Sequence, residues 1–281
     1  MKKNIFITAF VLLLASFSAS AQDALVLDEI FYKGVMAYRL RDIPKAKAYW
    51  ERAADRGHAL AMYSLGRLYQ YGDLGSPDLE AAEKWHREAA IRGVTPAQYQ
   101  LAKLLLDQQE AEEAAHWMSE SAMADYVAAQ HDLAVMYEEG TGVKPSMESA
   151  AKWYLEAAEN GSMPAQFKLV TMYMEGKGVE QNDQKAFEWA TKASESGDPN
   201  AKYLLGYMFY TGTGTVTNLE MAEVWLREAI AEGQSKAKKL LEEVKKKQQA
   251  NSKLLRLKAA DPLNNHMETD PVIALMQNRA S

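Results

Sequence analysis

The chain has 281 residues, of which 48% are hydrophobic and 25% are charged, and it contains no cysteine. This composition is typical of a water-soluble folded protein, and the absence of cysteine excludes disulfide bridges, cysteine-ligated zinc and a thiol-linked lipid anchor. The formal charge of −6 argues against a general nucleic-acid-binding surface, because the phosphate backbone attracts basic proteins.

Residues 1–21 have the pattern of an export signal. Two lysines follow Met1, an apolar run covers residues 5–17, and Ala19-Ser20-Ala21 supplies the small residues of an A-x-A cleavage site. The apolar run is too short to cross a bilayer, which takes about 20 residues. We therefore expect cleavage before Gln22 and delivery of the mature chain to the periplasm of a Gram-negative bacterium.

A repeat of about 36 residues organises the following part of the chain. Its clearest marker is a tryptophan that recurs at spacings of 32, 36, 36 and 36: Trp85, Trp117, Trp153, Trp189 and Trp225. In each repeat an alanine stands three residues before this marker and a small residue four residues after it, which places all three on one helical face. We expect the ring to fill the gap to a neighbouring helix. Glycine stands eight residues after most markers, where a helix ends in a left-handed turn, and Asp125 is the exception.

A second apolar pattern precedes each of these helices. It runs alanine, leucine, aromatic or leucine at i, i+4 and i+8, as in Ala61, Leu65 and Tyr69, which again marks one helical face. A glycine turn such as Gly140 and Gly142 joins the two helices of a pair, and a four-residue deletion in the third repeat removes it. Prolines occupy the starts of several first helices, where a missing N–H costs little: Pro96, Pro164 and Pro199.

Helix pairs of this size cannot bury their apolar faces alone, and stacking them in tandem buries a continuous core. We therefore predict an all-α fold, a right-handed α-solenoid of helix-turn-helix repeats that ends in a capping helix. The predicted boundaries are a leading repeat at 22–58, further repeats at 59–234 and the basic capping helix at 235–260.

The repeated pattern resembles the Sel1-like repeat, a relative of the tetratricopeptide repeat. The fourth repeat reads AQHDLAVMYEEGTGV over residues 129–143 and continues through Ala150, Trp153 and Gly161. The resemblance covers residues 28–234. The chain departs from the family where Ala102, Ala134 and Val170 stand in place of the preferred glycine, and it lacks the disulfides of many secreted relatives. The resemblance implies an adaptor, a scaffold or a regulator of partner proteins.

Helical geometry predicts which side chains would meet a partner. The residues two and six positions after the first-helix alanine lie opposite the core, and in related solenoids first helices line the concave face. The predicted partner-binding residues are Tyr63, Arg67, Tyr99, Lys103, His131, Phe167, Thr171, Tyr203 and Tyr207. Edged by Gln98, Gln130 and Gln166, this surface would suit an extended or helical peptide. The alternative is that the rings pack between adjacent repeats.

The region after the repeats is strongly basic. Residues 234–260 hold nine Lys or Arg and two Glu and keep helical spacing. They fit a cap that shields the last repeat, and residues 236–258 alternatively fit a basic arm for an anionic membrane or an acidic partner. Residues 261–281 are expected to be disordered, and residues 272–276 among them could dock within this chain or on a partner.

No pattern of catalytic or metal-binding chemistry emerges from the sequence. The five histidines are not spaced as zinc ligands, and the glycine turns lack the spacing of phosphate-binding loops. Ser235-Lys236-Ala237-Lys238 matches the S-x-x-K string of penicillin-recognising enzymes but lacks its companion motifs, so a helix cap at Ser235 is the preferred interpretation. We expect no metal, no cofactor, no nucleic acid and no enzymatic activity.

The sequence therefore favours a periplasmic protein-protein interaction scaffold or a regulator of a cell-envelope partner. Two alternatives stay open. One is a β-lactam or cell-wall active enzyme, and the other is an immunity protein that neutralises a delivered toxin.

Overall fold

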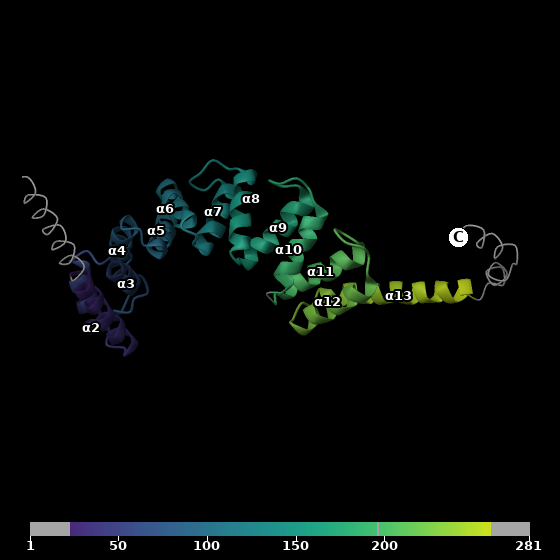
Figure 1. Ribbon diagram of the computed structural model, residues 1–281, viewed down its shortest axis with the longest axis horizontal. Coiled ribbons are helices and arrows are strands. Elements are labelled where there is room, and N and C mark those ends of the chain that lie inside the picture. Colours follow the sequence, from purple (N-terminus) through teal and green to yellow (C-terminus); the bar gives the residue numbers. More distant parts are fainter. Residues whose placement is uncertain (1–22, 196, 260–281) are drawn as a thin grey trace, which may run out of the picture. The chain divides into compact units, whose positions relative to one another are not determined.

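A computed structural model describes residues 23–195 and 197–259 of the chain (Figure 1). It is helical throughout, and no strand occurs in these ranges. After a helical segment at residues 23–39, the helices are α2 (Ile43–Ala54), α3 (Ala59–Gln70), α4 (Leu79–Ile91), α5 (Thr95–Asp107), α6 (Ala111–Met123), α7 (Val127–Glu139), α8 (Met147–Glu159), α9 (Met163–Glu175), α10 (Asp183–Glu195), α11 (Pro199–Thr211), α12 (Leu219–Ala231) and α13 (Ala237–Ala259). The predicted all-α class is confirmed. The predicted signal at 1–21 and the predicted tail at 261–281, with its segment 272–276, lie outside the described residues.

The chain divides into two compact units, residues 1–162 and residues 163–281. The described part of the first unit runs from residue 23 to α8, and the second contains α9 to α13. Within each unit, every helix packs chiefly against the helices directly before and after it in the chain. This nearest-neighbour packing is what tandem helix pairs require, because each pair buries its apolar face on the next.

Each helix pair has, in the same register, a buried side chain on its second helix and a small residue or a valine on its first helix, and in three of the pairs the two meet closely at a glycine. We call the former the knob residues, and all six are buried: Trp50, His86, Met118, Tyr154, Ala190 and Leu226. We call the latter the socket residues: Gly34, Gly66, Ala102, Ala134, Val170 and Gly206. A Cβ added at Gly66 would lie 2.6 Å from Nδ1 of His86, and one at Gly206 would lie 2.8 Å from Cγ of Leu226. Among the departures from glycine, Val170 shares the register with the small Ala190, whereas Ala102 and Ala134 share it with the larger Met118 and Tyr154.

The recurring tryptophans stand one position before the knob residues. Trp85, Trp117 and Trp153 are only half-buried and pack against the margin of the core. The prediction that each tryptophan fills the gap between helices is therefore wrong for these three. One residue along a helix rotates a side chain by about 100°, so the neighbouring knob points into the pair while the indole covers its edge.

The predicted helix ends are confirmed. Glycines eight residues after the aromatic marker have positive φ, as at Gly161 with φ +91°, and Asp125 adopts the same left-handed conformation with φ 59°. In the third repeat α5 ends at Asp107 and α6 begins at Ala111, so the predicted four-residue deletion shortens the turn and leaves both helices intact.

The C-terminal helix α13 has a buried part and an exposed part. Its first turns bury Ala237, Leu240, Leu241 and Val244 against α12, and the Gln248 side chain donates a hydrogen bond to the Leu219 carbonyl at 3.3 Å. This part is the predicted cap of the last repeat. Residues 249–259 are all exposed.

The pairing of socket and knob sizes yields a testable prediction in α9 and α10. Val170 and Ala190 are both completely buried, and the register of the other repeats places them opposite each other. Ala190→Leu should destabilise the protein by about 1–3 kcal/mol through overpacking, and Val170→Gly in the same chain should recover most of that loss by recreating the Gly206–Leu226 arrangement. Urea denaturation of the two single variants and the double variant measures the coupling, and additive effects would contradict the size pairing.

Candidate functional site

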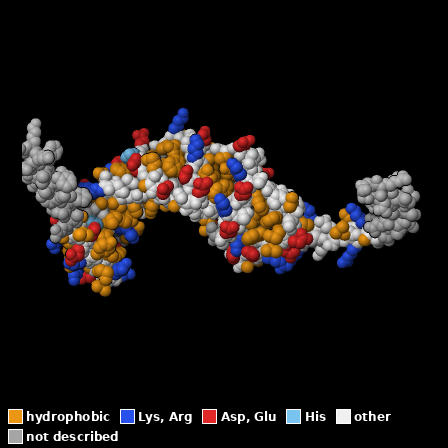
Figure 2. Space-filling model, viewed as in Figure 1, with side chains coloured by type: hydrophobic (Ala, Val, Ile, Leu, Met, Phe, Trp, Pro, Cys, Tyr) orange, Lys and Arg blue, Asp and Glu red, His pale blue; other side chains and the backbone are white. Residues whose placement is uncertain are grey.

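The nine residues predicted to bind a partner all lie on the first helices of the repeats, α3, α5, α7, α9 and α11, and each is at least partly exposed. We call them together the first-helix surface. Figure 2 shows one face of the molecule, on which hydrophobic patches are bordered by acidic and basic side chains. The role of these nine residues in binding stays a prediction.

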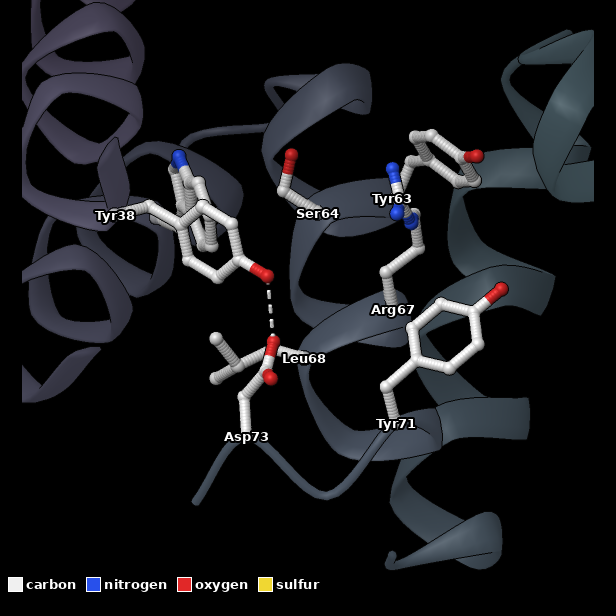
Figure 3. Close-up of a pocket in the computed structure, with 8 residues that line it drawn as sticks. Tyr38, Tyr63, Ser64, Arg67, Leu68, Tyr71 and Asp73 are labelled. Atoms are coloured by element: carbon white, nitrogen blue, oxygen red, sulfur yellow. Dashed lines mark hydrogen bonds between the residues drawn. The ribbon is translucent and has the colours of Figure 1, made fainter. Parts of the chain in front are cut away.

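In the first unit, Tyr63 and Arg67 line a cavity of about 150 Å³ between the first and second repeats (Figure 3). The other lining residues are Tyr38, Trp50, Ser64, Leu68, Tyr71 and Asp73. The cavity thus has aromatic walls, one cation and one carboxylate. The sequence pattern identified Tyr63 and Arg67 but missed Tyr38, Tyr71 and Asp73. The latter two follow α3, where helical periodicity ends.

The charged groups of this cavity are held in defined positions. The Arg67 guanidinium carbon lies 5.9 Å from the ring centroid of Tyr63 and 5.5 Å from that of Tyr71, so the side chain lies between the two rings (Figure 3) in cation–π geometry. On the other wall, the Tyr38 hydroxyl donates a hydrogen bond of 2.8 Å to Oδ2 of Asp73. This hydrogen bond, together with burial, raises the pKa of Tyr38.

A second polar cluster joins α5 to α7 around Asp132. The Tyr99 hydroxyl donates to Oδ2 of Asp132 at 2.9 Å, Nδ1 of His131 lies 3.0 Å from Oδ1, and Nζ of Lys103 lies 3.8 Å from Oδ2. Burial acts to raise the pKa of Asp132, but the hydrogen bonds from His131 and Tyr99 and the charge of Lys103 outweigh it and lower the pKa. Two predicted partner-binding residues, Tyr99 and Lys103, therefore also join adjacent repeats, and His131 supports their shared partner from the same helix.

The Asp132 cluster predicts a loss of stability on substitution. Asp132→Ala should lower the free energy of unfolding by about 1–3 kcal/mol, because it leaves the half-buried Tyr99 hydroxyl and the His131 ring without their acceptor. Asp107→Ala, at an exposed carboxylate at the end of α5, is the matched control and should change it by less than about 0.5 kcal/mol. Equal denaturation midpoints for the two variants would show that the cluster adds nothing to repeat cohesion.

In the second unit, the predicted residues are less closely connected. Phe167 lines an open hollow of about 470 Å³ with Met163, Pro164, Asp198 and Asn200. The Thr171 hydroxyl donates to the Lys168 carbonyl of its own helix at 2.8 Å. Tyr203 packs against the core of α12 and α13, whereas Tyr207 is exposed. The structure therefore offers Phe167 and Tyr207 to a partner more directly than the other two.

The three glutamines that the sequence placed at the edge of this surface are buried instead, which corrects that prediction. The Gln98 side chain donates to the Ala90 carbonyl at 3.4 Å, and the Gln130 side chain donates to the Ala122 carbonyl at 3.3 Å. Both acceptors lie in the last turn of the preceding helix, whose carbonyls have no partner within the helix. The glutamine of one repeat thus completes the hydrogen bonding of the previous repeat, as at Gln98 and Gln130.

The S-x-x-K string that begins at Ser235 leads into the start of α13. Ser235 is exposed, and the amide of Lys236 donates to the side-chain oxygen of Gln234 at 3.2 Å, so Gln234 occupies the capping role predicted for Ser235.

Within the described ranges, no three His, Asp or Glu side chains are grouped so that they could hold a metal ion. Of the helices that the structure describes, none combines the length and apolarity of a membrane span.

The sequence profile of the Sel1 repeat matches six successive segments of the chain. They are residues 24–58, 59–94, 95–126, 127–162, 164–198 and 199–234. Apart from the first residue of the N-terminal helical segment and of α9, these segments cover every helix up to α12, and they hold all nine residues of the first-helix surface. None of the curated proteins is similar enough in sequence to match the chain.

Solved structures share this architecture. A protective antigen of uropathogenic Escherichia coli strains with an SLR fold is 28% identical with a TM-score of 0.73, over 79% of this chain and 50% of that one; the chain thus spans half the length of that protein. A Sel1 repeat protein of Oxalobacter formigenes is 24% identical with a TM-score of 0.67, over 75% of this chain and 88% of that one. An immunity protein of Pseudomonas aeruginosa reaches only 18% identity and a TM-score of 0.43, over 72% and 83%, and this likeness supports no functional argument.

Proposed function

Because the chain belongs to the Sel1 repeat family, whose members are generally protein-interaction scaffolds, we propose that it is a periplasmic scaffold or regulator that holds a cell-envelope partner on its first-helix surface. The repeats supply a rigid support, since each helix is fixed by the helices on both sides of it in its unit. Binding then needs only the exposed side chains that this support presents.

The observation that carries the proposal is the kind of side chain exposed on successive first helices. In the first unit these helices present Tyr63, Arg67 and Lys103 beside a preformed cavity and a polar cluster, and in the second they present Phe167 and Tyr207. Tyrosine and arginine dominate the residues that contribute most to protein interfaces. A surface that only had to stay in solution would carry mostly Lys, Glu and Asp here.

Photo-crosslinking in cells tests whether this surface holds a partner. A photoreactive phenylalanine analogue at Tyr63 or Tyr207 should give one discrete adduct. The same analogue at Lys152, an exposed position on the second helix α8, should give none. Adducts of the same size and yield from all three positions would overturn the proposed binding surface.

Periplasmic location is a separate part of the proposal and rests on the sequence of residues 1–21. Osmotic-shock fractionation of a Gram-negative host that produces the full chain should release a protein whose first residue is Gln22. Recovery with the cytoplasmic fraction, with Met1 retained, would refute export.

The exposed end of α13 is proposed as an auxiliary contact for an acidic partner. Lys253, Arg256 and Lys258 lie in the exposed stretch of residues 249–259, which contains no acidic residue. Exposed leucines lie beside these cations, namely Leu254, Leu255 and Leu257, as in helices that bind through both charge and apolar contact. Truncation after residue 248 should weaken binding of the crosslinked partner at low salt and leave the fold of the repeats unchanged.

A further inference from the structure

We propose that the cavity lined by Tyr38, Tyr63, Arg67, Tyr71 and Asp73 is the anchor site for a carboxylate of the bound peptide, with Arg67 as its counter-charge. This inference rests on the proposed function and names the chemistry that the partner brings to one place on the first-helix surface. It concerns a single side chain or chain end of the partner, so the rest of the interface is independent of it.

The size of the cavity sets the size of the group that it accepts. Its volume of about 150 Å³ lies below the roughly 300–1,000 Å³ of small-molecule and cofactor sites. It is close to the volume that takes up one benzene-sized group in an engineered protein cavity. One side chain of a peptide fits this space, whereas a nucleotide or a folded segment does not.

Arg67 supplies the charge that such a group would meet. Within the part of the chain that the structure describes, no carboxylate lies within ion-pair distance of Arg67. Arg87, in the same repeat, pairs with Glu83 of its own helix and with Glu113 of the next repeat. The Arg67 side chain is instead held between the rings of Tyr63 and Tyr71. A guanidinium that is fixed in place and has no anionic partner loses little further side-chain freedom when it binds a carboxylate through two parallel hydrogen bonds.

The carboxylate of Asp73 favours a peptide over a simple anion as the ligand of this cavity. Its Oδ2 atom accepts a hydrogen bond from the Tyr38 hydroxyl, which fixes the carboxylate on the wall opposite Arg67 (Figure 3). A ligand that brought only negative charge would be repelled by this carboxylate. An acidic residue of a peptide brings its carboxylate to Arg67 and its backbone N–H groups to Asp73, so it satisfies both walls.

Random-peptide display on the mature chain tests the inference directly. One library presents heptapeptides inside a coat protein, and a second presents them with a free C-terminus. Peptides selected on the wild type are counted against those selected on Arg67→Met, which keeps the aliphatic stem and removes the charge. Arg39→Met, at an exposed arginine of the preceding repeat, is the matched control, and thermal melts check that both variants stay folded.

The expected result is enrichment of Asp or Glu at one fixed position on the wild type and on Arg39→Met, and loss of that enrichment on Arg67→Met. If the enriched peptides instead need the free C-terminus, the carboxylate comes from a chain end, which also supports the inference. In calorimetry, the most enriched synthetic peptide should bind Arg67→Met at least tenfold more weakly than it binds the wild type. The same peptide with its carboxylate changed to an amide should bind the wild type at least tenfold more weakly than the acid does. Selected peptides with no acidic bias, or equal binding of acid and amide peptides, would overturn the proposed anchor site. The crosslinking experiment at Tyr63 and Tyr207 tests the scaffold function separately.

Discussion

Acidification from pH 7 to pH 4 is expected to remove about 3 kcal/mol from the free energy of unfolding through His86 alone. This knob residue of α4 is completely buried. Its Nε2 atom lies 3.0 Å from the side-chain oxygen of Gln70, so Nε2 carries the proton of the neutral ring. The Nδ1 atom lies against the Gly66 backbone and has no hydrogen-bond partner. A second proton would therefore be buried without an acceptor.

The pKa of His86 follows from these surroundings. Burial is the main cause and the positive charge of Arg67 adds to it, and together they lower the pKa from 6.5 to about 4. The titratable side chains that face the ring are Arg67 and Tyr63, both on α3. In the unfolded chain the histidine keeps its ordinary pKa. Between pH 6.5 and pH 4 the unfolded state therefore binds a proton that the folded state does not. The free energy of unfolding consequently decreases as the pH is lowered through this interval.

Comparison with a variant that cannot titrate isolates the contribution of His86. His86→Met replaces the ring by the residue that serves as knob in the next repeat, Met118. Urea denaturation at pH 7, 5.5 and 4.5 should show the wild type losing stability relative to His86→Met as pH falls, and His116→Met, at an exposed ring, should retain the wild-type pH dependence. A pH dependence unchanged in His86→Met would contradict the assignment.

The repeat length, the helix order and the helix ends were predictable because each leaves a regular mark on the sequence. Alanine, aromatic and glycine recur at set offsets, and a glycine such as Gly161 marks a backbone conformation that few other residues adopt. The knob position was not predictable from the same pattern. Its occupants range from Trp50 to Ala190, so it has no recurring residue type that would mark it in the sequence.

The candidate site was predictable in part for the same reason. Helical geometry placed Tyr63 and Arg67 on an exposed face, and the structure shows them lining one cavity. Asp73 reaches the same cavity from the turn after α3, where no periodicity specifies direction. For the glutamines, the sequence predicted exposure where the structure shows burial. A polar side chain such as Gln130 is expected at the surface unless its acceptor is known, and here the acceptor is the Ala122 carbonyl of the preceding repeat.

Substitution of Gly142 by alanine is expected to be among the most damaging single changes in the first unit. Gly142 has φ +69°, and an added Cβ would overlap the carbonyl oxygen of Ala111 at the start of α6. The turn between α7 and α8 thus touches the main chain of the preceding repeat at Gly142, which has no side chain. Backbone cannot rotate away as a side chain can, so the overlap has to be relieved by separating the repeats.

The variant Gly161→Ala measures the cost of backbone strain at a glycine that lacks such a contact. Gly161 has φ +91° and open space around its added Cβ, so its substitution should cost only the left-handed conformation, about 1–2 kcal/mol. Gly142→Ala should cost at least about 1–3 kcal/mol more, the usual cost of overpacking. Urea denaturation gives both values, and hydrogen exchange should show faster opening of α6 and α7 in Gly142→Ala only. Equal losses in the two variants would mean that the turn is free to shift and that Gly142 serves conformation alone.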